Sequence, residues 1–158
     1  MIYIEAPNNI KTKNLDRTSI FLVGGITGCP DWQTQVREEL QSLPIMLFNP
    51  RRENFPIDDP DAAEEQIRWE YRYLCLANGV LFWFPCETLC PITLYELGTL
   101  SAGPKCIFVG VHPDYARRQD IEIQTQIRRP DVRIVYSLEG LLDQVRARVD
   151  TIDRARAF

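Results

Sequence analysis

Two glutamates stand where a carboxylate could do chemistry, and Glu96 is the first. It comes early in an expected helix that follows the apolar run 80–84. The amino-terminal end of a helix favours an ionised carboxylate, and such a group can attack an electrophilic carbon, as in glycosyl transfer. Thr93 stands three residues earlier, so the spacing also fits a capping box in which Glu96 only bonds the Thr93 N–H. The residue is therefore either a nucleophile or a helix cap.

Glu70 is the second candidate, because it interrupts the apolar stripe of an expected helix over 60–78. The stripe consists of Ala63, Ile67, Leu74 and Ala77. A carboxyl group on such a stripe must be desolvated, paired with a cation, or exposed to a cavity. Burial would raise its pKa and suit it to give a proton to a leaving group. The alternative is a buried ion pair with Arg51 or Arg52.

A glycine-rich segment could approach a ligand through its backbone. Gly24, Gly25, Ile26 and Thr27 open the segment 24–30, in which three glycines fall within five residues. Such a loop either lets backbone N–H groups point at ligand oxygens or forms a tight structural turn. It matches neither the dinucleotide-binding fingerprint nor the phosphate loop of nucleotide hydrolases.

Arg51 and Arg52 could bind an anion at the end of another expected strand. Their guanidinium groups suit the geometry of phosphate or carboxylate. The alternative is a salt bridge to a nearby acid, and the sequence offers Glu53, Asp58 and Asp59.

Strands and helices are expected to alternate along the chain. The expected strands are the apolar runs 20–24, 45–49, 80–84, 106–111 and 132–136. The expected helices run from an Asp31 cap to about 42, from an Asp59 cap to 78, from 91 or 93 to 102, around 121–127, and around 141–149. This pattern predicts an α/β fold with a doubly wound, five-stranded parallel sheet in three layers. We expect one domain over 1–158, with 1–17 as an edge strand or an arm.

The expected strand order, 2-1-3-4-5, places a ligand crevice. Strands 20–24 and 80–84 would be neighbours, and the loops that follow them would leave to opposite faces of the sheet. Ligands of such sheets bind at this switch point, beyond the carboxyl ends of the strands. The loops concerned are 24–30 and 85–93, and Glu96 follows the second.

Composition excludes several classes of partner. The chain has 18 Lys and Arg against 22 Asp and Glu, a net charge of −4, which argues against nucleic acid and favours a small substrate. No apolar run approaches the roughly 20 residues that cross a bilayer, and the first residues do not resemble a signal peptide, so a cytoplasmic protein is expected. Five cysteines and one histidine indicate neither a disulfide framework nor a metal site.

Several of these segments resemble the nucleoside 2-deoxyribosyltransferase family. They are Phe21–Thr27, Asn49–Arg52, Gln66–Tyr71, Leu81–Pro85, Leu94–Gly98 and Val109–Tyr115. The resemblance covers roughly residues 19–136, in order, and the Glu-Leu-Gly after the third strand is its most specific element.

The resemblance implies a flavodoxin-like fold and a double displacement without a cofactor. Glu96 would attack the anomeric carbon of a nucleoside, expel the base and hold the sugar as an ester until a second base or water takes it. Glu70 would handle proton transfer at the base. Family members commonly form oligomers in which a neighbouring subunit contributes a polar side chain to the sugar pocket, and Asp120 is the position that could match it.

Two features leave the reaction open. Glu87 and two cysteines stand in the loop where well-studied transferases place an aspartate that grips the sugar hydroxyl, so Glu87 is the candidate sugar contact. Relatives also include hydrolases of nucleoside monophosphates, for which Arg51 and Arg52 would suit the 5′-phosphate. A nucleotide-binding module without turnover is a further alternative, and a flavodoxin-type electron carrier is disfavoured because the first loop offers a single hydroxyl.

Overall fold

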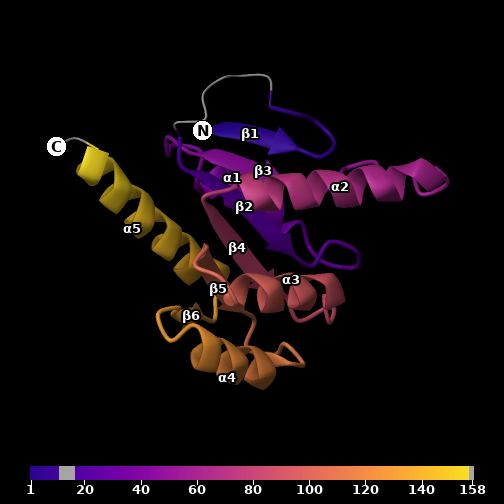
Figure 1. Cartoon of the computed structure of the whole chain (residues 1–158). Helices are drawn as coiled ribbons and strands as arrows, with labels where there is room; N and C mark the ends of the chain where they lie inside the picture. The colour runs from indigo at the N-terminus through magenta and orange to yellow at the C-terminus, as the bar shows by residue number, and fades with distance from the viewer. Residues whose placement is uncertain (11–16, 157–158) are drawn as a thin grey trace.

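The computed structural model describes residues 1–10 and 17–156 of the chain. These residues form a six-stranded parallel sheet and five helices (Figure 1). The strands are β1 (Ile2–Glu5), β2 (Ser19–Gly24), β3 (Met46–Asn49), β4 (Gly79–Phe84), β5 (Cys106–Val111) and β6 (Ile134–Val135). The helices are α1 (Trp32–Glu39), α2 (Pro60–Leu76), α3 (Pro91–Ser101), α4 (Arg118–Arg128) and α5 (Leu138–Arg156).

The sheet has the order β1-β3-β2-β4-β5-β6, and every neighbouring pair is parallel. Without β1 this is the 2-1-3-4-5 order that the sequence predicts. The expected count of five strands was one too low, because Ile2–Glu5 pairs with Met46–Asn49 as an edge strand. Of the segment 1–17, expected as an edge strand or an arm, residues 2–5 form this edge strand, while 11–16 lie outside the described residues.

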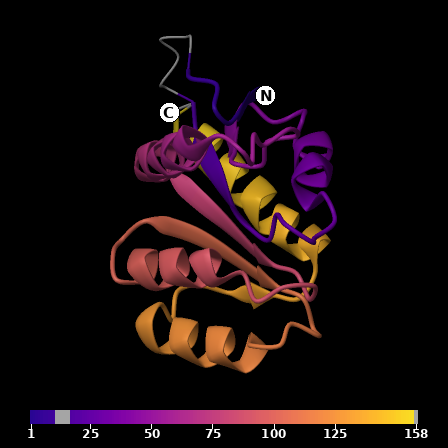
Figure 2. The same cartoon turned by 90° about the vertical axis from the view of Figure 1, so that its right-hand side faces the viewer.

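Helices cover both faces of the sheet, which gives the predicted three layers. Figure 2 shows α2, α3 and α4 stacked along one side and α1 and α5 on the other. Alternate residues of each strand feed two cores: Phe21 and Val23 pack with α2, α3 and α4, whereas Ile20 and Leu22 pack with α1 and α5. None of the described helices is long and apolar enough to cross a membrane.

Side-chain caps begin two of the helices where the sequence predicts them. The Asp31 carboxylate accepts from the Thr34 N–H at 3.1 Å, and the Asp59 carboxylate accepts from the Asp61 N–H at 2.9 Å. Both bonds satisfy backbone donors that a helix start leaves unpaired.

The buried face of α2 differs from the predicted stripe. Trp69 and Tyr73 are its large buried residues, while Ile67 is 64% exposed. The rings of Trp69 and Tyr73 contact each other with centroids 4.5 Å apart, and Trp69 also packs on Phe21 of β2. Two aromatic rings bury more apolar area than the aliphatic residues of the predicted stripe, so they determine which side of the helix faces the sheet. Glu70 lies at the edge of this face.

Candidate active site

A cleft of about 270 Å³ opens at the carboxyl ends of β2 and β4. The chain leaves β2 toward α1 on one face and leaves β4 toward α3 on the other, as expected for a switch point. The lining comes from the end of β2 and the loop after it (21–27), from Pro50 and Glu70, and from the segment that leads into α3 (Thr88, 90–93 and Glu96). The structure thus brings Glu70, Glu96 and the glycine segment to one cavity.

The Glu96 carboxylate lies in this cleft without a protein partner. The residue is half-buried, and within residues 1–10 and 17–156 no donor or cation lies in bonding range of its oxygens. The predicted capping box is wrong: α3 begins at Pro91 with Cys90 as its N-cap, so Thr93 is already inside the helix. A carboxylate that caps nothing and pairs with nothing is available to a ligand.

Glu70 enters the cleft from α2 and is held by Gln66, one turn earlier. Gln66 Nε2 donates to Glu70 Oε1 at 2.7 Å and to the Pro50 carbonyl at 2.7 Å. The alternative of an ion pair with Arg51 or Arg52 is therefore wrong. Burial raises the pKa of Glu70, and the hydrogen bond from Gln66 opposes this rise because it stabilises the ionised form.

The two carboxyl groups influence each other. Burial raises the pKa of Glu96 from 4.5 to about 7, and the negative charge of Glu70 adds to the rise. The favourable effect of the helix terminus, expected from sequence, is outweighed, because Glu96 lies beyond the first turn of α3, where that effect fades. Near neutral pH, ionisation of one carboxyl therefore opposes ionisation of the other, and the pair favours holding one proton.

The glycine segment packs tightly against its neighbours and also lines the cleft. A Cβ on Gly25 would lie 2.5 Å from Cys29 Sγ and 2.7 Å from Pro85 Cγ, so no side chain fits there without movement of the loop. Gly28 has a φ of +73°, which favours glycine. The expected alternatives for this loop are thus not exclusive, because a tightly packed turn also lines the cleft.

Cys90 is a strained residue directly before α3. Its φ of 47° places it in the left-handed region, which is uncommon for residues other than glycine and concentrates at functional sites. The thiol donates to the Thr88 carbonyl at 3.5 Å, and Tyr115 holds the same loop through a 2.7 Å bond to the Leu89 carbonyl. Burial raises the pKa of Cys90 to about 12, with the nearby Cys29 and Glu87 adding to the rise. The thiol is therefore neutral in the cleft.

Arg51 and Arg52 line a neighbouring polar cavity that shares Ile26 and Thr27 with the cleft. Neither makes the predicted salt bridge to Glu53, Asp58 or Asp59. Arg51 lies 3.8 Å from Asp31 and donates to the loop after β2, whereas Arg52 lies 3.3 Å from Glu65. Both guanidinium groups are thus engaged within the protein.

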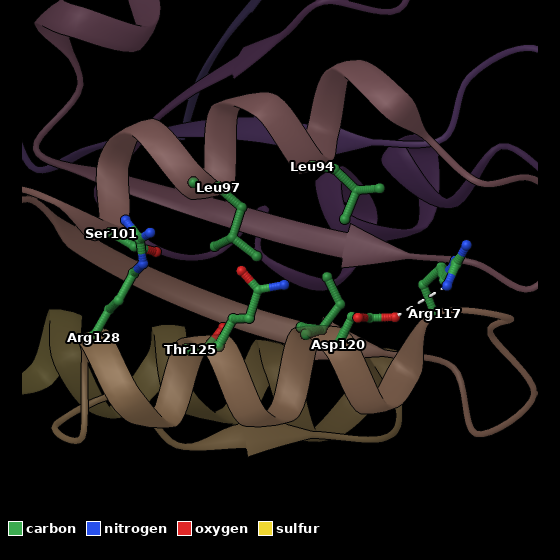
Figure 3. Close-up of a pocket in the computed structure, with 10 residues that line it drawn as sticks. Leu94, Leu97, Ser101, Arg117, Asp120, Thr125 and Arg128 are labelled. Atoms are coloured by element: carbon green, nitrogen blue, oxygen red, sulfur yellow. Dashed lines mark ion pairs between the residues drawn. The ribbon is translucent and has the colours of Figure 1, made fainter.

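Two other candidates lie away from the cleft. Glu87 is exposed and is not among the lining residues. Asp120 lies at one end of a separate groove between α3 and α4, where its carboxylate is 3.6 Å from Arg117 (Figure 3). Leu94 and Leu97 of α3 point into this groove, on a different side of the helix from Glu96. Asp120 therefore contacts no part of this chain's own cleft.

Sequence reasoning missed several residues that shape the site. Gln66 and Cys90 are the clearest, and the buried pair Trp32 and Gln33 holds the Gly25 carbonyl. Gln66 is one turn from Glu70, a spacing that could have signalled the contact. In the described part of the chain, no group of three or more His, Cys, Asp or Glu side chains could hold a metal ion.

The family model described as "Nucleoside 2-deoxyribosyltransferase like" matches residues 17–115. The chain belongs to this family. The matched region spans β2 to the loop after β5 and contains the glycine segment and both cleft glutamates, whereas Asp120 lies beyond it. A comparison with curated proteins gives no match.

The raised pKa of Glu96 predicts a stability effect. The folded protein binds this proton more tightly than the unfolded chain does, so the free energy of unfolding falls as the pH rises from about 4.5 to about 7. Glu96→Gln removes the charge, and we expect it to stabilise the protein at pH 8 by on the order of 1–3 kcal/mol, with little difference at pH 4. Denaturant unfolding at both pH values measures this.

Glu87→Gln, which alters an exposed carboxylate, is the matched control and should give no such gain. A Glu96→Gln variant that is less stable than wild type at pH 8 would instead show a carboxylate stabilised by a donor.

Proposed function

We propose that this protein cleaves the N-glycosidic bond of a nucleoside or deoxynucleoside by double displacement and transfers the sugar to another base. The observation that carries this proposal is the unpartnered carboxylate of Glu96, which faces a cleft that also contains Glu70. Membership of the family supports the class of reaction.

In the first step, a Glu96 carboxylate oxygen attacks the anomeric carbon. The bond from that carbon to the base nitrogen breaks, and its electron pair goes to the base, which takes a proton from Glu70. The product is a sugar ester on Glu96. In the second step, the nitrogen of another base attacks the same carbon and gives its proton to Glu70, which regenerates the Glu96 carboxylate. The reactive form has Glu96 ionised and Glu70 protonated, one proton for the pair.

Water could replace the second base, which would make the protein a hydrolase. A 5′-monophosphate substrate is the related alternative, because the cavity with Arg51 and Arg52 adjoins the cleft. We place the nucleoside first, since both guanidinium groups already have protein partners. A binding module without turnover would leave the unpartnered Glu96 carboxylate without a role.

We further propose that a second copy of the chain covers the cleft. Ile67 and Tyr71 flank Glu70, and Ile92 and Tyr95 lie on α3 near Glu96. All four are more than 60% exposed. Apolar side chains grouped around a site are typical of an interface. An arrangement of this kind could also bring Asp120 of one copy to the sugar pocket of another.

Incubation with deoxynucleosides and a free purine tests the reaction. We expect base exchange by the wild type, and we expect Glu96→Ala to lose turnover by at least about a thousandfold while it stays folded, since it removes the nucleophile. Chromatography of the bases separates transfer from release into water. Absence of both products with nucleosides and with monophosphates would contradict the proposal.

The pH dependence tests the roles of the two carboxyl groups. We expect a bell-shaped profile: kcat/KM rises with pH as the pair loses its first proton and falls through about 7 as it loses the second, because only the singly protonated pair is reactive. Glu70→Gln should lower kcat by about 10²–10⁴-fold. It should also remove the fall above about 7, because position 70 then has no proton to lose.

A nucleoside whose purine is methylated at N7 is the control substrate, because its base is already positively charged and leaves as a neutral molecule without taking a proton. Glu70→Gln should slow cleavage of this control substrate far less than cleavage of an ordinary nucleoside. An equal loss with both substrates, or a fall above about 7 that persists in Glu70→Gln, would remove Glu70 from the proton transfer.

A further inference from the structure

The carbonyl of Gly25 is fixed by two side chains of α1. Trp32 Nε1 donates to it at 2.8 Å and Gln33 Nε2 donates at 3.3 Å. Both side chains are buried, and Trp32 packs in the core on the face opposite Glu70 and Glu96. The C=O and N–H of a trans peptide point in opposite directions. With the Gly25 carbonyl drawn toward α1, the N–H of Ile26 therefore points to the cleft side.

Arg51 fixes Gln33 and the rest of the loop. Gln33 is 0% exposed, and its Oε1 accepts from Arg51 Nη1 at 3.1 Å. The same guanidinium donates to the Pro30 carbonyl at 3.1 Å and to the Cys29 carbonyl at 3.4 Å. Burying an amide without hydrogen-bond partners costs free energy. The Gln33 side chain is therefore held in the orientation in which its Nε2 and its Oε1 are both bonded. The end of β3 thus clamps both ends of the glycine segment.

The Ile26 N–H has no acceptor among the residues that the structure describes, although Ile26 lines the cleft and its own carbonyl accepts from the Cys29 N–H at 3.3 Å. Backbone donors in folded proteins are nearly always satisfied, by protein, water or ligand. A donor held rigidly before the ligand arrives stabilises a substrate oxygen without reorganisation.

We propose that Gln33 and Arg51 are positioning residues that hold the Gly25–Ile26 peptide so that the Ile26 N–H donates to an oxygen of the substrate. The substrate's identity rests on the proposed function, whereas the clamp does not. The oxygen belongs either to the nucleoside itself or to a 5′-phosphate. Arg51 acts through the loop in both cases and does not contact the phosphate.

Three variants separate these roles. Gln33→Met keeps the length of the side chain and removes both bonds, and Gln33→Glu keeps an acceptor for Arg51 but cannot donate to the Gly25 carbonyl. Arg51→Met removes the outer half of the clamp. Gln35→Met, exposed on the same helix, is the matched control.

The clamp is measured first without ligand, from hydrogen exchange of the Cys29 amide followed by NMR on the full-length protein. We expect exchange to accelerate at least about tenfold in Gln33→Met and Arg51→Met and to stay unchanged in Gln35→Met. Addition of a deoxynucleoside, or of its 5′-monophosphate, to Glu96→Gln should shift the Ile26 amide resonance and slow its exchange.

Kinetics provide the second measurement. We expect Gln33→Met and Gln33→Glu to lower kcat/KM by about 10–10³-fold, as the loss of one oriented donor does, mainly through kcat. Arg51→Met should lower kcat/KM equally for a nucleoside and for its monophosphate. A loss confined to the monophosphate would make Arg51 a phosphate ligand and overturn the proposal.

Unchanged Cys29 exchange in all three variants, or an Ile26 amide that responds to neither ligand, would also overturn it. Glu96→Gln should still bind nucleosides, so the response of Ile26 is readable whether or not the wild type turns them over. Absence of turnover together with a responding Ile26 amide contradicts the proposed function alone.

Discussion

The site depends on the desolvation of two carboxyl groups in one cleft. Glu70 is drawn inward because Trp69 and Tyr73 turn α2 onto the sheet, and Gln66 then fixes its carboxylate against the carbonyl of Pro50. Glu96 enters from the second turn of α3, whose start is set by Cys90 and Pro91. Neither carboxylate has a cation partner in the described part of the chain, so burial raises both pKa values, and the negative charge of Glu70 adds to the rise for Glu96.

This arrangement explains how two like residues could take different roles. A pair that holds one proton near neutral pH can present a carboxylate at one position and an acid at the other, as paired carboxyl groups do in glycosidases. The surroundings differ: Gln66 stabilises the ionised form of Glu70, whereas Glu96 faces the cleft without a donor, so the free protein holds the proton mainly on Glu96 and the reactive form is the minor one. The glycine segment supplies the opposite wall, and its conformation is fixed from α1 and β3 rather than from within.

Much of the fold could be predicted from the sequence because its signals are local. Apolar runs marked the five strands β2 to β6, and Asp31 and Asp59 marked helix starts. The switch point followed from the strand order alone. The sequence did not distinguish an edge strand at Ile2–Glu5 from an arm, since the pairing of this strand with β3 joins segments more than forty residues apart. The buried face of α2 was wrong because aliphatic spacing was weighed above the area that two aromatic rings bury.

The site was predictable where a residue carries a charge or lacks a side chain. Glu70, Glu96 and the segment Gly24–Thr27 stand out in the sequence and line the cleft. Gln33 does not stand out, because a neutral amide inside a helix has no local signal and its partners, Gly25 and Arg51, come from other elements. The capping box failed because a left-handed Cys90 starts α3 three residues before Thr93.

Covalent attachment of the sugar to Glu96 is the most direct test of this account. A deoxynucleoside analogue with fluorine at the sugar 2′-position slows both steps, so the ester accumulates and mass spectrometry of the digested protein can locate it. The account predicts one added glycosyl group, on the peptide that contains Glu96, released when a free purine is added. Consumption of the analogue with no adduct, or with an adduct on another residue, would contradict it.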